Sequence, residues 1–365
     1  MMNLNVSGRA APFCKLADLS RYVACPWDLT ADPAGRAHWI EFFKRHLGTM
    51  LSLGVEAAAA RGETRENASQ RADRCRLEFI AAFDAFGAAA DQFGRVTILT
   101  LDRWRDDILR RHGFVDPFID LKNRENEKML PLLATVCDQI DSLSGTEQFR
   151  AVVHGIFAGN IFDMGADATA KKFLHVSPDF FATRDTLPEH PWLIDDYAAL
   201  AQRMLGGPLH KKAVFFIDNA GSDFLLGALP AIRWLARRGT PVVLAANSRP
   251  TLNDMTVDDV RAWWPRILQV EPSFGELPIS IVGTGTGEPL IDLGQIDPQL
   301  NAAASDADLV ILEGMGRGVE SNLEAEFNCD TLNIAMLKDS AVAGRHGGKV
   351  FDLVCQFRAG KSPGA

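Results

Sequence analysis

The chain has 365 residues, of which 47% are apolar and 23% charged, and its net charge is −9 at pH 7. This composition is typical of a globular protein with a large core, and the acidic balance argues against nucleic acid as a partner. The sequence contains neither an apolar run of the ~18 residues that a membrane span needs nor a signal-peptide pattern at its start. We therefore expect a cytoplasmic protein without a membrane partner, and the sequence leaves its oligomeric state open.

The first part of the chain, residues 1–205, is dominated by helical patterns. After an irregular lead-in, Asp32 and Pro33 suit the start of a helix, and apolar residues then recur at helical spacing. The stretch Ser177–Pro191 has no regular pattern. We expect a helical bundle with further helices at Thr64–Phe86, Val96–Arg111, Glu125–Leu143, Glu147–Asp163 and Trp192–Leu205.

The second part, residues 206–365, alternates short strands with helices. Short β-branched and aromatic runs bounded by turn residues predict strands. These runs are Ala213–Ile217, Pro241–Ala246, Pro278–Val282, Leu309–Leu312, Leu332–Leu337 and Val350–Phe357, the last as an antiparallel edge strand. The predicted fold class is α/β, with an N-terminal helical bundle (1–205) and a doubly wound domain (206–365) whose sheet is mostly parallel.

Two helices of the second part have recognisable start signals. We expect Ser222 to cap a helix that runs to Arg238 and that Pro230 bends. Thr256 and Asp259 have the spacing of a capping box, with Asp in place of Glu, at the start of the next helix.

Polar residues follow the predicted strands at their carboxyl ends, where α/β sheets bind ligands. Carboxylate and amide oxygens suit Mg²⁺, Mn²⁺ or a similar ion, and a lysine suits phosphate, so the set indicates metal-assisted phosphoryl chemistry. The residues are Asp218, Asn219, Asn247, Asp254, Thr284, Glu313 and Lys338.

Each of these residues also has a simpler interpretation. Taken alone, Asp218 is explained as well by a hydrogen-bonded turn, Asp254 by a cap near a helix start, and Lys338 by a surface position. Gly283–Gly287 lacks the spacing of a nucleotide motif and is by default a flexible loop. Gly314–Gly318 fits either a phosphate-binding turn or a tight turn.

One further pair of polar residues is ambiguous. Asn160 and Asp163 share a helical face between large apolar residues. They are either partnered core groups or a wall of the site, and we favour the site.

These motifs together resemble the damage-control phosphatase family, formerly domain of unknown function eighty-nine. The resemblance is strongest in VFFIDNAGSDFLLGALPAIRWLARRGTPVVLAANSRPTLNDMT and continues through Gly155–Ala166, Ser305–Asn322 and Leu332–Ala343. The chain is similar above all to the branch of plant stand-alone phosphatases and the C-terminal domain of eukaryotic pantothenate kinase four. The resemblance implies a Rossmann-like α/β/α domain and a metal-dependent phosphatase of small metabolites, such as 4′-phosphopantetheine, its damaged forms or sugar phosphates.

The resemblance also implies roles for single residues. Asp218 and Asn219 of IDNAG and Asp254 of LND would bind the divalent ion, which would be Mn²⁺, Co²⁺, Ni²⁺ or Mg²⁺. Asp218, Asp254 and Lys338 would be the catalytic residues, with Lys338 meeting the substrate phosphate. The substrate pocket would be lined by Asn160, Asp163, Asn247, Glu313, Gly314, Gly316 and Arg317.

The resulting hypothesis is a phosphomonoesterase with a metal-bound water as nucleophile. Asp218 is the less favoured nucleophile, because the lone pairs of a metal ligand are committed. Asp223 or Glu313 would orient the water. Two other classes stay open, namely an S-adenosylmethionine-dependent methyltransferase with its cofactor at Gly283–Gly287, and a non-catalytic module that binds a phosphorylated metabolite. Arg249, which departs from the plant-like sequence, leaves the substrate open.

Overall fold

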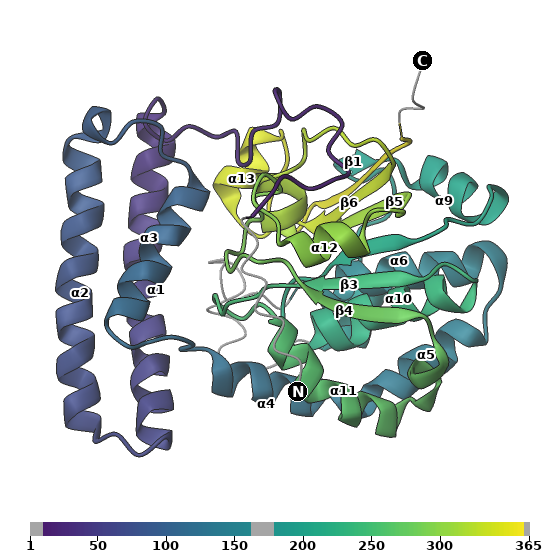
Figure 1. Cartoon of the computed structure of the whole chain (residues 1–365), viewed down its shortest axis with the longest axis horizontal. Coiled ribbons are helices and arrows are strands. Elements are labelled where there is room, and N and C mark those ends of the chain that lie inside the picture. Colours follow the sequence, from purple (N-terminus) through teal and green to yellow (C-terminus); the bar gives the residue numbers. More distant parts are fainter. Residues whose placement is uncertain (1–9, 162–178, 361–365) are drawn as a thin grey trace.

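The computed structural model describes residues 10–161 and 179–360 (Figure 1). It confirms the predicted fold class, with a helical N-terminal region and a mostly parallel sheet. The α-helices are α1 (Pro33–Ala60), α2 (Arg65–Ala88), α3 (Ile98–Arg111), α4 (Ile119–Met129), α5 (Leu133–Asp141), α6 (Gly145–Gly159), α8 (Phe180–Asp185), α9 (Tyr197–Gly206), α10 (Leu229–Arg237), α11 (Val257–Val270), α12 (Pro298–Ala303) and α13 (Ser340–Arg345). The strands are β1 (Ile194–Asp195), β2 (Ala213–Phe216), β3 (Val242–Ala246), β4 (Ile279–Gly283), β5 (Leu309–Glu313), β6 (Asp330–Met336) and β7 (Leu353–Arg358).

Helices α1, α2 and α3 lie side by side and project from the rest of the molecule (Figure 1). The predicted start of α1 is confirmed, because the Asp32 side chain accepts a hydrogen bond from Gly35 N at 2.9 Å. Aromatic rings fill the space between α1 and α2, where the centroids of Phe43 and Phe83 are 5.3 Å apart. In the described ranges, none of the helices combines the length and the apolar character that crossing a membrane requires.

Two predicted helices differ from the structure. Glu125–Leu143 is not one helix, because a short 3₁₀ segment at Leu130–Leu132 that contains Pro131 separates α4 from α5. Residues 192–205 contain β1 before α9 begins at Tyr197. The irregular stretch that the sequence predicts before them includes the short helix α8. The domain boundary near residue 205 stays a prediction.

The seven strands follow the order β1-β7-β6-β5-β2-β3-β4. Each strand in the series β6, β5, β2, β3 and β4 is parallel to the next one. Strand β7 runs antiparallel to β6, as the sequence predicts. Strand β7 is not at the edge, however, because β1 pairs with it on the other side.

Both faces of the central strands are buried, and alternate residues point to different layers. Phe215, Leu244 and Ile311 occupy adjacent register positions and pack in one apolar cluster with α6 and α10. Val214 and Phe216 belong to the opposite cluster, which α12 and segments near residues 13–16 and 291–296 cover. The sheet is thus the middle of three layers, and its carboxyl edge is held by packing on both sides.

The helix after β2 does not start as the sequence predicts. Ser222 makes no side-chain capping bond, and residues Asp223–Ala228 form a wide π-helical turn before α10. Pro230 follows shortly after this π-helical turn, and the residues before it already have helical dihedral angles, so the wider turn is the place where the helix accommodates the proline. Helix α6 packs closely on this turn, and Ser222 Oγ donates to Gly159 O at 3.1 Å.

This packing predicts the effect of a methyl group at Gly159. A Cβ atom there would lie 2.8 Å from Ser222 O and 3.0 Å from Asp223 Cα, which are backbone atoms that cannot move aside alone. We expect Gly159→Ala to lower the free energy of unfolding by about 1–3 kcal/mol in chemical denaturation. Gly48→Ala in α1 is the control, since its Cβ would meet nothing within 4 Å, and it should stabilise by about 0.5–1 kcal/mol. Equal midpoints for Gly159→Ala and the parent chain would contradict this account.

Candidate active site

The centre of the sheet contains a point where the direction of strand addition reverses. From β2 the chain continues to β3 and β4 on one side, and it then returns to β5 and β6 on the other side. Ligands of open α/β sheets bind at the carboxyl ends of strands at such a point. Asp218 lies just after β2, and Glu313 is the last residue of β5. The predicted polar edge therefore falls at the position that the topology favours.

Backbone contacts join the turns that follow β2 and β3. Met255 N donates to Asp218 O at 2.9 Å, and Asn219 and Asp254 pair as an isolated antiparallel bridge. The structure thus brings together Asp218, Asn219 and Asp254, which the sequence proposes as metal ligands. Their role as ligands stays a prediction.

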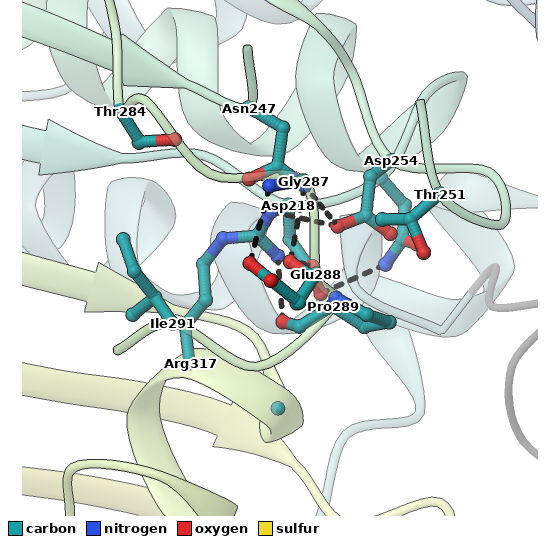
Figure 2. A network of polar contacts seen from close by, with 12 residues as sticks. Asp218, Asn247, Thr251, Asp254, Thr284, Gly287, Glu288, Pro289, Ile291 and Arg317 are labelled. Atoms are coloured by element: carbon teal, nitrogen blue, oxygen red, sulfur yellow. Dashed lines mark hydrogen bonds and ion pairs between the residues drawn. The ribbon is translucent and has the colours of Figure 1, made fainter. Parts of the chain in front are cut away.

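One guanidinium group joins the two carboxylates of this set (Figure 2). Arg317 Nη1 pairs with Asp218 Oδ1, and Arg317 Nη2 donates to Asp254 Oδ2 at 2.7 Å. Asn247 Nδ2 donates to the same Asp254 oxygen at 3.1 Å. Arg317 comes from the π-helical turn Met315–Glu320 after β5 and is buried. A buried cation therefore holds the turns after β2 and β3 to the turn after β5.

Asn160, at the end of α6, connects a second group of buried residues. Its Nδ2 atom donates to Asp223 Oδ2 at 2.9 Å and to Asp218 Oδ2 at 3.3 Å. Its Oδ1 and backbone oxygens accept from Lys338 Nζ at 3.1 and 2.7 Å. Glu313 Oε2 accepts from Asp218 N at 3.2 Å. Asn160 is therefore a partnered group that forms part of the site, which combines the two interpretations of the sequence.

Burial opposes ionisation of these acids. It raises the pKa of Asp218 well above its usual range, although the Arg317 charge acts in the opposite direction. Burial and the nearby charge of Asp223 also raise the pKa of Glu313. Burial disfavours the charged form of Arg317, but the Asp254 and Asp218 carboxylates outweigh it and raise the pKa, so the guanidinium stays protonated.

Acidic groups outnumber basic groups at this edge. The buried acids, which we call the carboxylate cluster, are Asp218, Asp223, Asp254 and Glu313, and the buried cations beside them are Arg317 and Lys338. One buried oxygen, Asn247 Oδ1, has no hydrogen-bond donor among the described residues, and the Asp223 and Glu313 carboxyl groups share a hydrogen bond. An excess of acidic groups and an oxygen atom without a donor are features that a divalent cation satisfies.

The possible metal ligands are oxygen atoms. Within residues 10–161 and 179–360 no group of three or more His, Cys, Asp or Glu side chains is arranged to hold a metal. The predicted set contains two carboxylates and the amide of Asn219, and hard oxygen ligands of this kind fit Mg²⁺ or Mn²⁺. The residues present are therefore compatible with an ion that is bound by Asp218, Asn219 and Asp254.

The polar edge opens into a pocket of about 530 Å³, which includes space open to solvent. One part of its lining is the predicted metal site. The other part comes from α1 and α3, and four further segments complete it. The lining residues are Asp218, Asn219 and Asp254, then Trp39, Phe42, Phe43, Ile98, Asp102 and Arg105, and finally Leu252, Pro289, Leu290, Met315, Gly316, Glu320 and Asp339.

Most of the other residues predicted to bind substrate lie behind this lining. They contact its residues and not the pocket itself, and they comprise Asn160, Asn247, Glu313, Gly314, Arg317 and Lys338. Gly316 lines the pocket directly. Asp163 lies outside the described residues.

Two of the simpler interpretations are wrong. Lys338 is fully buried and is not a surface lysine. Asp254 does not cap a helix, because Thr256 and Asp259 form the capping box of α11, as the sequence predicts. Asp218 does receive a bond from the neighbouring Asn219 side chain, at 2.8 Å, but its partners also include residues far away in the sequence.

The segment Gly283–Gly287 is packed and not an open loop. A Cβ atom at Gly285 would lie 3.0 Å from Asp297 N, and one at Gly287 would lie 2.8 Å from Arg249 O. These glycines are needed because the chain approaches itself, which explains them without a bound cofactor. The turn Gly314–Gly318 is tight, with Gly318 N donating to Gly314 O at 2.8 Å.

The sequence reasoning missed the contribution of α3. Arg105 donates to Asp102 Oδ1 at 2.6 Å, to Asp106 Oδ1 at 2.7 Å and to Thr251 Oγ1 at 2.8 Å. These bonds tie α3 to the loop that carries Asp254. The available signal was the spacing of Asp102, Arg105 and Asp106, since residues at i, i+3 and i+4 share one face of a helix.

Comparison with known proteins identifies relatives of this chain. Residues 64–354 match the damage-control phosphatase ARMT1-like domain. The chain is 40% identical to a damage-control phosphatase of Arabidopsis thaliana, and the match covers 71% of each protein. It is 30% identical to the 4′-phosphopantetheine phosphatase of Mus musculus and 34% identical to pantothenate kinase 2 of Arabidopsis thaliana. Each of these two matches covers 94% of this chain but only 48% and 41% of the relative, so the chain spans less than half of either protein.

A solved structure has the same fold. The crystal structure of a DUF89 family protein from Pyrococcus horikoshii superposes with a TM-score of 0.63 at 17% identity. The match covers 89% of this chain and 98% of the other. It supports the arrangement of a helical region on a mostly parallel sheet.

Gly314 offers a direct test of the site geometry. Its φ angle is +95°, and a Cβ atom would lie 2.1 Å from Asp218 Oδ2. We expect Gly314→Ala to displace this carboxylate and to weaken Mn²⁺ binding at least about tenfold, measured by calorimetry. Gly62→Ala is the matched control, because it has the same φ of +95° and nothing within 4 Å of the added atom. Similar Mn²⁺ affinities for both variants would contradict the proposed position of Asp218.

Proposed function

This chain belongs to the ARMT1-like damage-control phosphatase family, and on that premise we propose that it is a divalent-metal-dependent phosphatase of small phosphorylated metabolites. The observation that carries the proposal is the meeting of Asp218, Asn219 and Asp254 at one end of a pocket. Family membership supports the phosphatase activity, and the buried excess of carboxylates supports the need for a cation.

The ion, for which Mn²⁺, Co²⁺, Ni²⁺ and Mg²⁺ are the candidates, would be held by Asp218, Asn219 and Asp254. When bound, it supplies Lewis-acid polarisation of a phosphate P–O bond. Arg317 contacts both carboxylates from behind the pocket lining, so its charge favours the ionised form of Asp218 and Asp254 that binding a cation requires. Lys338 lies behind the pocket lining and holds the Asn160 side chain by a hydrogen bond. The Asn160 amide in turn orients the carboxylates of Asp218 and Asp223.

Water is the proposed nucleophile. It attacks phosphorus, the bond between phosphorus and the ester oxygen breaks, and inorganic phosphate forms. One proton of the water is transferred to the ester oxygen, so the metabolite leaves as an alcohol. Asp223 and Glu313 lie behind the pocket lining and contact Asn219 and Asp218, so they are the candidates for orienting the water through these two residues. Asn247 donates a hydrogen bond to Asp254. Gly314 and Gly316 have no side chains, which leaves room for the Asp218 carboxylate and for the Pro289 backbone, respectively.

We propose 4′-phosphopantetheine or its damaged forms as the first substrates to test, with sugar phosphates as the alternative. The support is the 30% identity to a mouse protein that bears this activity in its name. The pocket is compatible with a substrate of this kind, because aromatic residues of α1 offer apolar surface next to the polar edge.

The test is phosphate release from p-nitrophenyl phosphate and from 4′-phosphopantetheine by the full chain. After treatment with a chelator, each of the four metals is added in turn. We expect a metal to restore activity, and we expect Asp254→Ala and Asp218→Ala to lower kcat/KM by at least about a hundredfold while the circular dichroism spectrum is unchanged.

Asp306→Ala is the control for these variants. Asp306 is exposed and pairs with Lys212 at the amino end of the same strands, so its loss should leave activity and metal binding unchanged. Metal binding is measured separately by calorimetry. Full activity of Asp254→Ala would contradict the site, and metabolite binding without hydrolysis under any metal would favour the non-catalytic module.

A further inference from the structure

The pocket has two chemically different sides. The predicted metal site lies on one side, and the other consists of Trp39, Phe42 and Phe43 of α1 with residues of α3, which we call the helical wall. The rings of the helical wall hold one another in place, since the centroids of Trp39 and Phe42 are 5.0 Å apart and those of Phe42 and Phe43 are 5.8 Å apart. A phosphate bound at the metal site would therefore direct the organic part of the substrate toward an apolar surface.

Asp102 and Arg105 are the two charged residues of the otherwise apolar helical wall. Asp102 is only 3% exposed and lines the pocket. Its Oδ1 atom accepts from Arg105 Nη1 at 2.6 Å, whereas its buried Oδ2 atom has no hydrogen-bond partner in the described part of the chain. A buried acceptor without a donor is destabilising. A ligand that supplies the missing partner removes this destabilisation.

Arg105 holds Asp102 in a fixed position. Its other hydrogen bonds go to Asp106 and to Thr251, so the guanidinium is fastened to α3 and to the loop before Asp254. The Phe43 ring also lies 5.6 Å from the guanidinium carbon. The Asp102 oxygen is thus preorganised at a fixed place relative to the metal site, as a specificity contact requires.

We propose that Asp102 determines specificity by forming a hydrogen bond through Oδ2 with a hydroxyl group in the organic part of the phosphate ester. The remainder of that part packs on the aromatic rings of the helical wall. The preferred substrates are then phosphomonoesters of largely apolar alcohols that carry one further hydroxyl group. This inference rests on the proposed phosphatase function and adds the substrate feature that the site selects.

A hydroxyl suits this oxygen better than an amide group does. Burial raises the pKa of Asp102 to about 7, although Arg105 opposes this, so both protonation states occur near neutral pH. A hydroxyl combines both functions at one atom, because it donates to the carboxylate and accepts from the carboxylic acid, whereas an amide group must exchange its N–H for its C=O group to do the same.

The experiment uses the metal-loaded full chain and pentyl phosphates that differ only in one hydroxyl group. The substrates are unsubstituted pentyl phosphate and the four isomers with a hydroxyl at carbon 2, 3, 4 or 5. We expect at least one isomer to be preferred over pentyl phosphate by about tenfold or more in kcat/KM. Asp102→Leu should remove this preference, while Asp102→Asn, which can still bond a hydroxyl, should retain a part of it.

Asp106→Leu is the matched control. Asp106 also pairs with Arg105 and also has a buried oxygen without a donor among the described residues, but it does not line the pocket. It should therefore keep the preference of the parent chain. Asp102→Ala and Asp106→Ala replace the leucine variants if these do not fold.

The outcomes separate this inference from the proposed function. An unchanged preference in Asp102→Leu, or an equal loss in Asp106→Leu, overturns the role of Asp102 while hydrolysis itself stands. Absence of hydrolysis of every ester, p-nitrophenyl phosphate included, overturns the proposed function. In that case the role of Asp102 is tested by calorimetric affinities for the five pentyl phosphates. Tighter binding of a hydroxyl-bearing isomer that depends on Asp102 supports the inference, and the absence of such a preference overturns it.

Discussion

Buried negative charge at the carboxyl edge of β2 and β5 is the constraint on which the site depends. Carboxylates are placed there without water, so each needs a cation, a proton or hydrogen-bond donors. Arg317 satisfies Asp218 and Asp254 together, and Asn160 brings donors to Asp218 and Asp223. The glycine turn that carries Arg317 and the end of α6 that carries Asn160 are held in place by these contacts. Charge compensation therefore organises three parts of the chain around one point.

The main features of the fold could be predicted because they depend on local pattern. Short β-branched runs ended by polar turns predict the central strands, and the Thr256–Asp259 spacing predicts the start of α11 correctly. The rule that ligands bind at carboxyl ends of strands then places Asp218 and Glu313 at one edge. The resemblance to a family adds the roles that such a pattern alone leaves open.

The remaining features depend on tertiary contacts. The π-helical turn before α10 packs so closely against α6 that only a glycine fits at position 159. No spacing of residues in the sequence indicates this contact. The burial of Lys338 beside Asn160 likewise follows from the docking of α6 on the sheet edge. The helical wall was missed because its aromatic residues have the periodicity of an ordinary helix core, and they line the pocket only after α1 and α3 pack against the loop of Asp254.

The two sides of the pocket come from widely separated parts of the chain. Residues of the phosphate end follow β2, β3 and β5, whereas the helical wall is encoded before residue 111. The two parts meet through polar contacts of α3, in which Arg105 reaches Thr251 and Arg103 pairs with Glu288, and through shared apolar packing. Substitutions in α1 and α3 can thus accumulate without disturbing the compensated charges at the sheet edge. Such a division lets descendants of one ancestor retain the same hydrolytic chemistry while they diverge in the metabolite that each accepts.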